Sequence, residues 1–307
     1  MLTPFRVAPL AQERVWGGTR LGPQGTLPIG ELWLAGPWLL VADGPYAGRT
    51  LDDVAAELGP ALVGSAAPSR PGPRFPLLVK LLDPAAWLSV QVHPDDAAAR
   101  RLAGPDAVGK AEAWYVLEAE PGAELLAGTR PGVREADLRV AMRAGAATTR
   151  LLARHAVTAG DVLLLAPGTL HAVGPGVLLY ELQQPSDLTY RVDDWGRPAS
   201  PGRRLHTKEA LASVVPQSRP AVRATTGGGR VAGCRHFTLD VVDAPARLDP
   251  AGRTVQVVTA VGTAAELAGD GWSARLEALE SIIVPASAGA WELRPGPGGR
   301  ALVAALP

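Results

Sequence analysis

The segment AWLSVQVHPDD, at residues 86–96, carries the side chains in this sequence best suited to chemistry. Side chains alternate between the two faces of a strand, so Ser89, Gln91 and His93 share one face while apolar residues occupy the other. An amide and an imidazole then lie about 7 Å apart on a rigid support. The simpler alternative is that these polar side chains only line a solvated sheet face.

Two further segments hold side chains of the same kind. In GKAEAWYVLEAEPG (109–122), Lys110 and Glu112 share one face of a strand-like run, where buried charges are costly unless they pair or bind something. In PGTLHAVGPG (167–176), His171 follows a buried-looking apolar run, in a turn of the kind that often presents functional groups. The simpler alternatives are an exposed ion pair and an ordinary surface histidine.

Together, Gln91, His93, Glu112 and His171 offer two nitrogen and two oxygen donors. This set suits a borderline divalent cation, with zinc first and iron(II), manganese or cobalt after it. The two oxygen donors favour a catalytic site over a structural one. Neither a CxxC pair nor an HExxH motif occurs, so the chain matches neither of these common zinc-site templates.

Strands, rather than long helices, are expected to position these residues. The 307 residues include 35 Gly and 29 Pro, and 47% of the chain is apolar, which is typical of short strands joined by tight turns. The pattern predicts an antiparallel sandwich or jelly roll. Strands are predicted at 77–83, 87–93, 112–118, 161–166, 177–184, 231–242, 254–261, 272–278, 281–285 and 301–306. Short helices are predicted at 50–58, at 133–154 with a break near Gly145, at 206–215 and after Pro94.

The chain is expected to divide near PQSRPAVRATTGGG (216–229), which is rich in turn residues and has no apolar periodicity. We predict a catalytic domain at 1–220 with inserted helices and a smaller β domain at 230–307. A faint repeat relates GDVLLLAPGTLHAV (160–173) to SIIVPASAGAWEL (281–293), with Gly289 where the register calls for His171. The second of two related barrels would therefore be degenerate.

Composition excludes several classes of partner. The 30 basic and 30 acidic residues balance, which leaves no electrostatic footprint for nucleic acid and no polybasic membrane patch. The single cysteine, Cys234, rules out an intramolecular disulfide and fits a reducing compartment. We see no signal-peptide core and no apolar run of the roughly 18 residues that a membrane helix needs. A cytoplasmic protein is expected.

The sequence resembles the class I mannose-6-phosphate isomerases of the cupin superfamily, in particular the short bacterial type. The segments that carry the resemblance occur in the family's order: RVWGGTRLG (14–22), IGELW (29–33), PLLVKLLD (76–83), LSVQVHPDD (88–96), GKAEAWYVL (109–117), PGTLHAVGPG (167–176) and ELQQPSDLTYRVDDWGR (181–197). The resemblance implies two jelly-roll barrels of cupin type and a zinc ion. The implied reaction is interconversion of mannose 6-phosphate and fructose 6-phosphate through a cis-enediol.

By this resemblance, the family's zinc ligands fall on Gln91, His93, Glu112 and His171, and its catalytic arginine falls on Arg191. Polar active-site positions fall on Lys80, Lys110 and Asp187, and we expect Lys80 and Ser89 to bind the sugar phosphate. The chain departs from the family pattern at Leu34, after GELW, and at Asp193, after the arginine. Both departures are expected near the pocket.

The implied reaction moves a proton between C1 and C2 and gathers negative charge on two sugar oxygens. A divalent ion would polarise the carbonyl, and Arg191 would neutralise the enediolate. The expected base is Lys110, with its pKa lowered by nearby positive charge, or Asp187.

Two other functions share such a metal cradle. An iron(II) dioxygenase would need open coordination positions for oxygen and would give Lys110 and Arg191 no role. A non-catalytic sugar-binding or regulatory cupin would fit the departures at Leu34 and Asp193.

Overall fold

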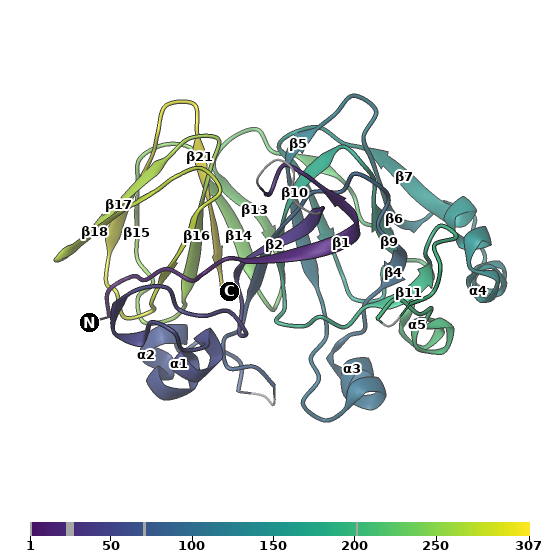
Figure 1. The fold of residues 1–307 in the computed structure, drawn as a ribbon, viewed down its shortest axis with the longest axis horizontal. Coiled ribbons are helices and arrows are strands. Elements are labelled where there is room, and N and C mark those ends of the chain that lie inside the picture. The colour runs from purple at the N-terminus through teal and green to yellow at the C-terminus, as the bar shows by residue number, and fades with distance from the viewer. Residues whose placement is uncertain (1, 23–27, 70–71, 201) are drawn as a thin grey trace.

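The protein is described by a computed structural model that covers residues 2–22, 28–69, 72–200 and 202–307. Its strands form four antiparallel sheets, arranged as two β-sandwiches that lie side by side (Figure 1). The expected fold, mainly β with a few short helices, is confirmed. The sheets of each sandwich remain separate hydrogen-bonded units within the described residues.

The first sandwich carries the residues singled out above. Its seven-stranded sheet has the order β1-β2-β3-β10-β5-β8-β12, and its five-stranded sheet the order β11-β4-β9-β6-β7. The bounds are β1 Leu10–Gly18, β2 Ile29–Ala35, β3 Leu78–Leu82, β4 Val90–Val92, β5 Glu112–Ala119, β6 Glu124–Thr129, β7 Leu152–Ala156, β8 Asp161–Leu165, β9 His171–Val173, β10 Val177–Gln183, β11 Tyr190–Asp193 and β12 Arg223–Ala224.

The second sandwich follows in the chain. Its sheets have the orders β13-β14-β21-β16-β19 and β15-β20-β17-β18. The bounds are β13 Gly229–Gly233, β14 Thr238–Val242, β15 Ala246–Leu248, β16 Gln256–Val261, β17 Ala265–Gly269, β18 Trp272–Leu276, β19 Ser281–Val284, β20 Trp291–Pro295 and β21 Arg300–Ala305.

The seven-stranded sheet is buried on both faces. On one face, Tyr115 and Leu182 pack in a core that includes Leu302 of the second sandwich. On the other face, Trp114 and Leu179 pack in the interior of the first sandwich. Strands covered on both sides have no polar face, so β3 and β10 read as continuous apolar runs. A charged residue inside such a run therefore stands out.

Helices are short and lie outside the sheets. Helix α1 (Leu51–Leu58) begins after Thr50, whose hydroxyl accepts a hydrogen bond from the backbone N–H of Asp53. Helix α3 (Asp96–Ala103) begins after Asp95, which accepts a hydrogen bond from the N–H of Ala98. The others are η1 (Gly44–Tyr46), α2 (Pro60–Val63), α4 (Glu135–Ala144), η2 (Ala146–Leu151) and α5 (Thr207–Ser213). No helix in the described part of the chain is long and apolar enough to cross a membrane.

The N-terminal part of the chain also reaches the second sandwich. Phe5 forms an antiparallel bridge with Ile283, and the α1–α2 pair lies below this sandwich in Figure 1. The backbone N–H of Ala286 donates to the carbonyl of Leu62 at 2.9 Å. In the segment 216–229, β12 still pairs with β8, and β13 then opens the second sandwich. The second sandwich thus contacts chain from both sides of the predicted break.

Three segments differ from the sequence prediction. The strand predicted at 231–242 is a hairpin of β13 and β14, because the chain turns between Cys234 and Phe237, whose backbone groups hydrogen bond. The break predicted near Gly145 within 133–154 is found, because α4 ends at Ala144 and Gly145 has a φ of +69°; beyond it, however, the chain continues through η2 into β7, which pairs with β6. The strand predicted at 87–93 is regular only over Val90–Val92.

Candidate metal centre and pocket

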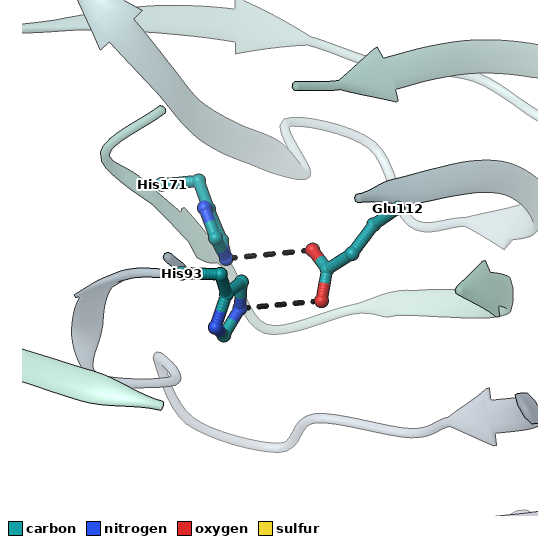
Figure 2. A group of neighbouring side chains, drawn as sticks. All are labelled: His93, Glu112 and His171. Carbon is teal, nitrogen blue, oxygen red and sulfur yellow. Dashed lines mark ion pairs between the residues drawn. The ribbon is translucent and has the colours of Figure 1, made fainter. Parts of the chain in front are cut away.

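Three buried side chains from both sheets of the first sandwich converge: His93, Glu112 and His171 (Figure 2). Glu112 opens β5, His171 opens β9, and His93 directly follows β4. Nε2 of His93 lies 3.2 Å from Oε1 of Glu112, and Nε2 of His171 lies 3.6 Å from Oε2. One donor atom from each residue lies within 4.8 Å of the others. The structure therefore brings together three of the four predicted ligands at metal-binding spacing.

The hydrogen bonds of the two histidines fix which ring nitrogen faces Glu112. Nδ1 of His93 lies 2.7 Å from the carbonyl oxygen of Leu188, and Nδ1 of His171 lies 2.9 Å from that of Thr169. A carbonyl oxygen only accepts, so each Nδ1 carries the proton and donates it. In the neutral rings, both Nε2 atoms then present a lone pair toward the carboxylate.

Protonation states in this group suit a cation. Burial, and then the charge of Lys110, lowers the pKa of His93 to about 3, and burial also lowers the pKa of His171. Burial alone would raise the pKa of Glu112, but Lys110 together with His93 and His171 outweighs burial and holds that pKa well below its usual value. Neither oxygen of Glu112 accepts a hydrogen bond of good geometry from the described residues. Two neutral imidazoles and an ionised carboxylate fit a divalent metal ion.

Lys110 supplies the positive charge closest to this carboxylate. Its Nζ lies 2.6 Å from Oε1 of Glu112 and 3.3 Å from Nε2 of His93. Burial would lower the pKa of Lys110, but Glu112 and then Glu181 outweigh burial and raise it. The lowered pKa expected from the sequence depends on the positive charge of a bound metal ion and stays a prediction.

Gln91, Ser89 and Arg191 form a hydrogen-bonded chain that leads to His171. Gln91 is paired with His171 between β4 and β9, and its Nε2 lies 3.3 Å from Nε2 of the histidine. Its Oε1 accepts a hydrogen bond from the hydroxyl of Ser89 at 3.1 Å, and that hydroxyl accepts one from Nε of Arg191 at 3.1 Å. A metal ligand must present oxygen, so ligation by Gln91 requires its amide to turn over. Its role as a ligand stays a prediction.

A pocket of about 670 Å³ adjoins these groups and is lined by both sheets of the first sandwich. Six of the residues predicted from the sequence share its wall: Lys80, Ser89, Gln91, Lys110, Asp187 and Arg191. Strand pairing also aligns three polar side chains across the pocket. Lys80 on β3 is opposite Glu181 on β10, and Glu181 is opposite Trp114 on β5. Directly opposed residues point to the same face of a sheet, so all three side chains face the pocket.

Among the pocket residues that the sequence analysis did not single out are Glu181, Glu31 and Arg14. Burial, and then the charge of Glu112, raises the pKa of Glu181 to about 7, and its carboxylate accepts a hydrogen bond from Nε1 of Trp114. The sequence could have revealed Glu181, because this charged residue interrupts the apolar run VLLYELQ. The same reasoning singled out Lys110 and Glu112. Glu31 lies in β2, where no strand was predicted.

Lys80 and Asp187, two further residues predicted from the sequence, lie close together in the pocket wall. Nζ of Lys80 lies 3.3 Å from Oε2 of Glu31 and 3.7 Å from Oδ1 of Asp187, whose side chain is 59% exposed.

The two departures from the family pattern, Leu34 and Asp193, do not line the pocket. Leu34 packs in the core between the sandwiches, and Asp193 is buried and accepts a hydrogen bond from the N–H of Trp195. Neither side chain therefore contacts the pocket directly, because Leu34 is used in packing and Asp193 in a backbone hydrogen bond.

The chain is similar to several known proteins. Residues 5–119 match the family model of the catalytic domain of phosphomannose isomerase type I. The mannose-6-phosphate isomerase of Streptococcus mutans is 38% identical over 232 residues, which cover 72% of this chain and 70% of that protein. The mannose-6-phosphate isomerase ManA of Bacillus subtilis is 37% identical over 227 residues, covering 71% and 70%. The crystal structure of a Bacillus subtilis mannose 6-phosphate isomerase superimposes with a TM-score of 0.84, at 27% identity and over 99% of both chains.

Proposed function

Because the chain belongs to the type I phosphomannose isomerase family, we propose that it interconverts mannose 6-phosphate and fructose 6-phosphate. The observation that carries this proposal is the buried group of His93, Glu112 and His171 beside a polar pocket. A pocket of about 670 Å³ is large enough for a hexose phosphate. The similar proteins named above are all isomerases, which favours this activity over the dioxygenase and the non-catalytic sugar-binding protein.

Zinc is the metal that we propose for this site. Nε2 of His93, Nε2 of His171 and a carboxylate oxygen of Glu112 would hold it, and this donor set is typical of catalytic zinc sites. The backbone carbonyls that accept from the two Nδ1–H groups orient the imidazoles, as partners outside the ligand set commonly do. When bound, zinc supplies Lewis-acid polarisation of a sugar oxygen.

Lys110 and Arg191 are placed to stabilise the negative charge that develops on the sugar oxygens. Lys110 faces the pocket as an ammonium group, since the neighbouring carboxylates raise its pKa. Arg191 is fixed at the wall, where Nε donates to Ser89 and Nη1 donates to the carbonyls of Gly202 and Arg204. Cationic donors that are already oriented stabilise such charge without reorganising during the reaction.

Transfer of the proton between C1 and C2 needs a group that exchanges protons near neutral pH. Glu181 meets this requirement, because its pKa is about 7 and it faces the pocket. Lys110 becomes a candidate once a cation at Glu112 cancels part of the charge that raises its pKa. Asp187, the other base considered from the sequence, is more than half exposed and lies beside Lys80. We therefore propose Glu181 as the proton acceptor, with Lys110 as the alternative.

An isomerase assay with and without chelator tests the proposal. Zinc-loaded protein is given mannose 6-phosphate, and formation of fructose 6-phosphate is followed. We expect turnover that chelator abolishes and added zinc restores. No turnover with any aldose phosphate would contradict the isomerase assignment. Abundant bound iron with oxygen uptake would instead support the dioxygenase, and sugar binding without turnover would support the non-catalytic protein.

A further inference from the structure

The carboxylate of Glu31 gathers three donors on the wall formed by β1, β2 and β3. Its Oε1 lies 2.8 Å from Nε of Arg14, and its Oε2 accepts from Nε1 of Trp33 at 2.7 Å. The same Oε2 lies 3.3 Å from Nζ of Lys80, which in turn lies 4.5 Å from the centroid of the Trp33 ring. Glu31 thus holds a guanidinium and an ammonium group side by side, both in the pocket wall.

The positive charge of this cluster is not fully compensated near neutral pH. Arg14 and Lys80 share the carboxylate of Glu31, whose side chain is 12% exposed. The buried Glu181 lies opposite Lys80, but burial and the charge of Glu112 raise its pKa to about 7, so it carries only part of a negative charge there. A further carboxylate near Lys80 belongs to Asp187, at the looser distance of 3.7 Å and with a 59% exposed side chain. An exposed carboxylate gives up such a contact at small cost, because water replaces it. A ligand with more negative charge can therefore displace Asp187 from Lys80.

Arg14 keeps part of its guanidinium available. Nε binds Glu31, and Nη1 donates to the side-chain oxygen of Gln12 and the carbonyl of Glu13. Nη2 has no acceptor among the described residues, and the side chain is 27% exposed. Arg191, on β11 of the other sheet, also lines the pocket.

We propose that Arg14 and Lys80, held together by Glu31, form the subsite that binds the phosphate group of the substrate, with Glu31 as the positioning residue. The inference rests on the proposed function, and it names Arg14 and Lys80 as the side chains that select a phosphorylated sugar over a free one. A phosphate dianion accepts hydrogen bonds from Nη2 of Arg14 and Nζ of Lys80, and charge-assisted bonds of this kind are the stronger ones. Metal ligation and phosphate recognition are thereby assigned to different parts of the pocket.

Direct binding to the zinc-loaded protein tests this subsite. Dissociation constants of inorganic phosphate and of mannose 6-phosphate are measured by titration calorimetry for wild type, Arg14→Met and Arg14→Lys. Arg49→Met is the matched control, because Arg49 pairs with Glu57 on the surface and does not line the pocket. Arg14→Met should weaken both ligands about 10- to 100-fold, as loss of a charged hydrogen bond does. Arg14→Lys should lose less, and Arg49→Met should match wild type.

A kinetic ratio gives a second readout that a purely structural role would not move. The kcat/KM for mannose 6-phosphate divided by that for mannose should fall at least tenfold in Arg14→Met. Unchanged phosphate affinity in a folded Arg14→Met protein with full zinc content would overturn the subsite, as would equal losses for both sugars. Wild-type protein that binds phosphate but turns over no aldose phosphate would contradict the proposed function and leave the subsite standing. Loss of phosphate binding in Arg49→Met would also count against the subsite.

Discussion

Nζ of Lys110 lies 2.6 Å from Oε1 of Glu112, at the point where the imidazoles of His93 and His171 also converge. Both side chains of this ion pair are almost completely buried. One of the two carboxylate oxygens that Glu112 could offer to a metal ion is thus already in contact with an ammonium group. Lysine and metal are expected to compete for Glu112, which links metal affinity to the position of a group in the pocket wall.

Replacing Glu112 with Gln should abolish tight metal binding. The carboxylate supplies the negative charge of the ligand set, and the two imidazoles alone are neutral. We expect metal affinity to fall at least about 100-fold, measured as zinc content after dialysis against a competing chelator. Glu57→Gln, a change at an exposed glutamate of α1, is the control and should retain zinc. One firmly bound zinc per chain in Glu112→Gln would show that the assigned ligand is wrong.

Removing the ammonium group of Lys110 should affect metal binding and catalysis in opposite directions. Lys110→Met deletes the cation that competes for Glu112, so zinc should bind roughly tenfold more tightly, as measured by chelator competition. At the same time kcat should fall about 100-fold or more, because the pocket loses a charged donor. Lys208→Met, on the exposed face of α5, should change neither quantity. Activity retained in Lys110→Arg would remove Lys110 from proton transfer.

Glu181→Gln should lower activity while stabilising the protein at alkaline pH. The pKa of Glu181 is about 7 when folded and 4.5 as the reference, so its ionisation opposes folding increasingly between pH 4.5 and 7. In chelator-treated protein, the free energy of unfolding of Glu181→Gln minus that of wild type should be about 3 kcal/mol higher at pH 8 than at pH 4. Urea unfolding at the two pH values measures this.

The kinetic part of the same prediction uses the role proposed for Glu181. A positioned acid or base contributes about 100- to 10,000-fold, so kcat should fall by that order in Glu181→Gln. The limb of the wild-type pH–rate profile near pH 7 should also disappear. A variant that keeps both kcat and this limb would exclude Glu181 as the proton acceptor.

Glu31→Gln should destabilise the protein at neutral pH and much less in acid. Burial would raise the pKa of Glu31, but Lys80 and Arg14 outweigh it and lower the pKa to about 2. The carboxylate therefore contributes stability that is complete above pH 4.5 and is lost as the pH falls toward 2. We expect a loss of about 3 kcal/mol at pH 6 that shrinks at pH 3, measured by urea unfolding. An equal loss at both pH values would point to packing rather than charge.

Much of the site was accessible from the sequence, since charged and polar residues interrupt apolar strands. Lys110 and Glu112 in β5, and Gln91 and His93 around β4, were recognised in this way. Glu181 follows the same rule and was overlooked. Glu31 was missed for a different reason: β2 was not predicted, and neither were β1, β6, β7, β9, β11, β12, β15, β17 and β20. Most of these strands are short or carry weak alternation, and they form because a neighbouring strand supplies their hydrogen bonds.

By itself the sequence determined what depends on neighbouring residues along the chain. Thr50 and Asp95 start helices because their side chains bond to backbone groups three residues later, and β5 is a strand because its side chains suit a buried sheet. Only the tertiary structure decided that the imidazoles of His93 and His171 meet Glu112 from the facing sheet and that Lys80 lies opposite Glu181. The tertiary structure also decided the pKa shifts of the buried side chains in the site. The physical reason is that burial and charge proximity depend on distances between strands, which local residue preferences do not fix.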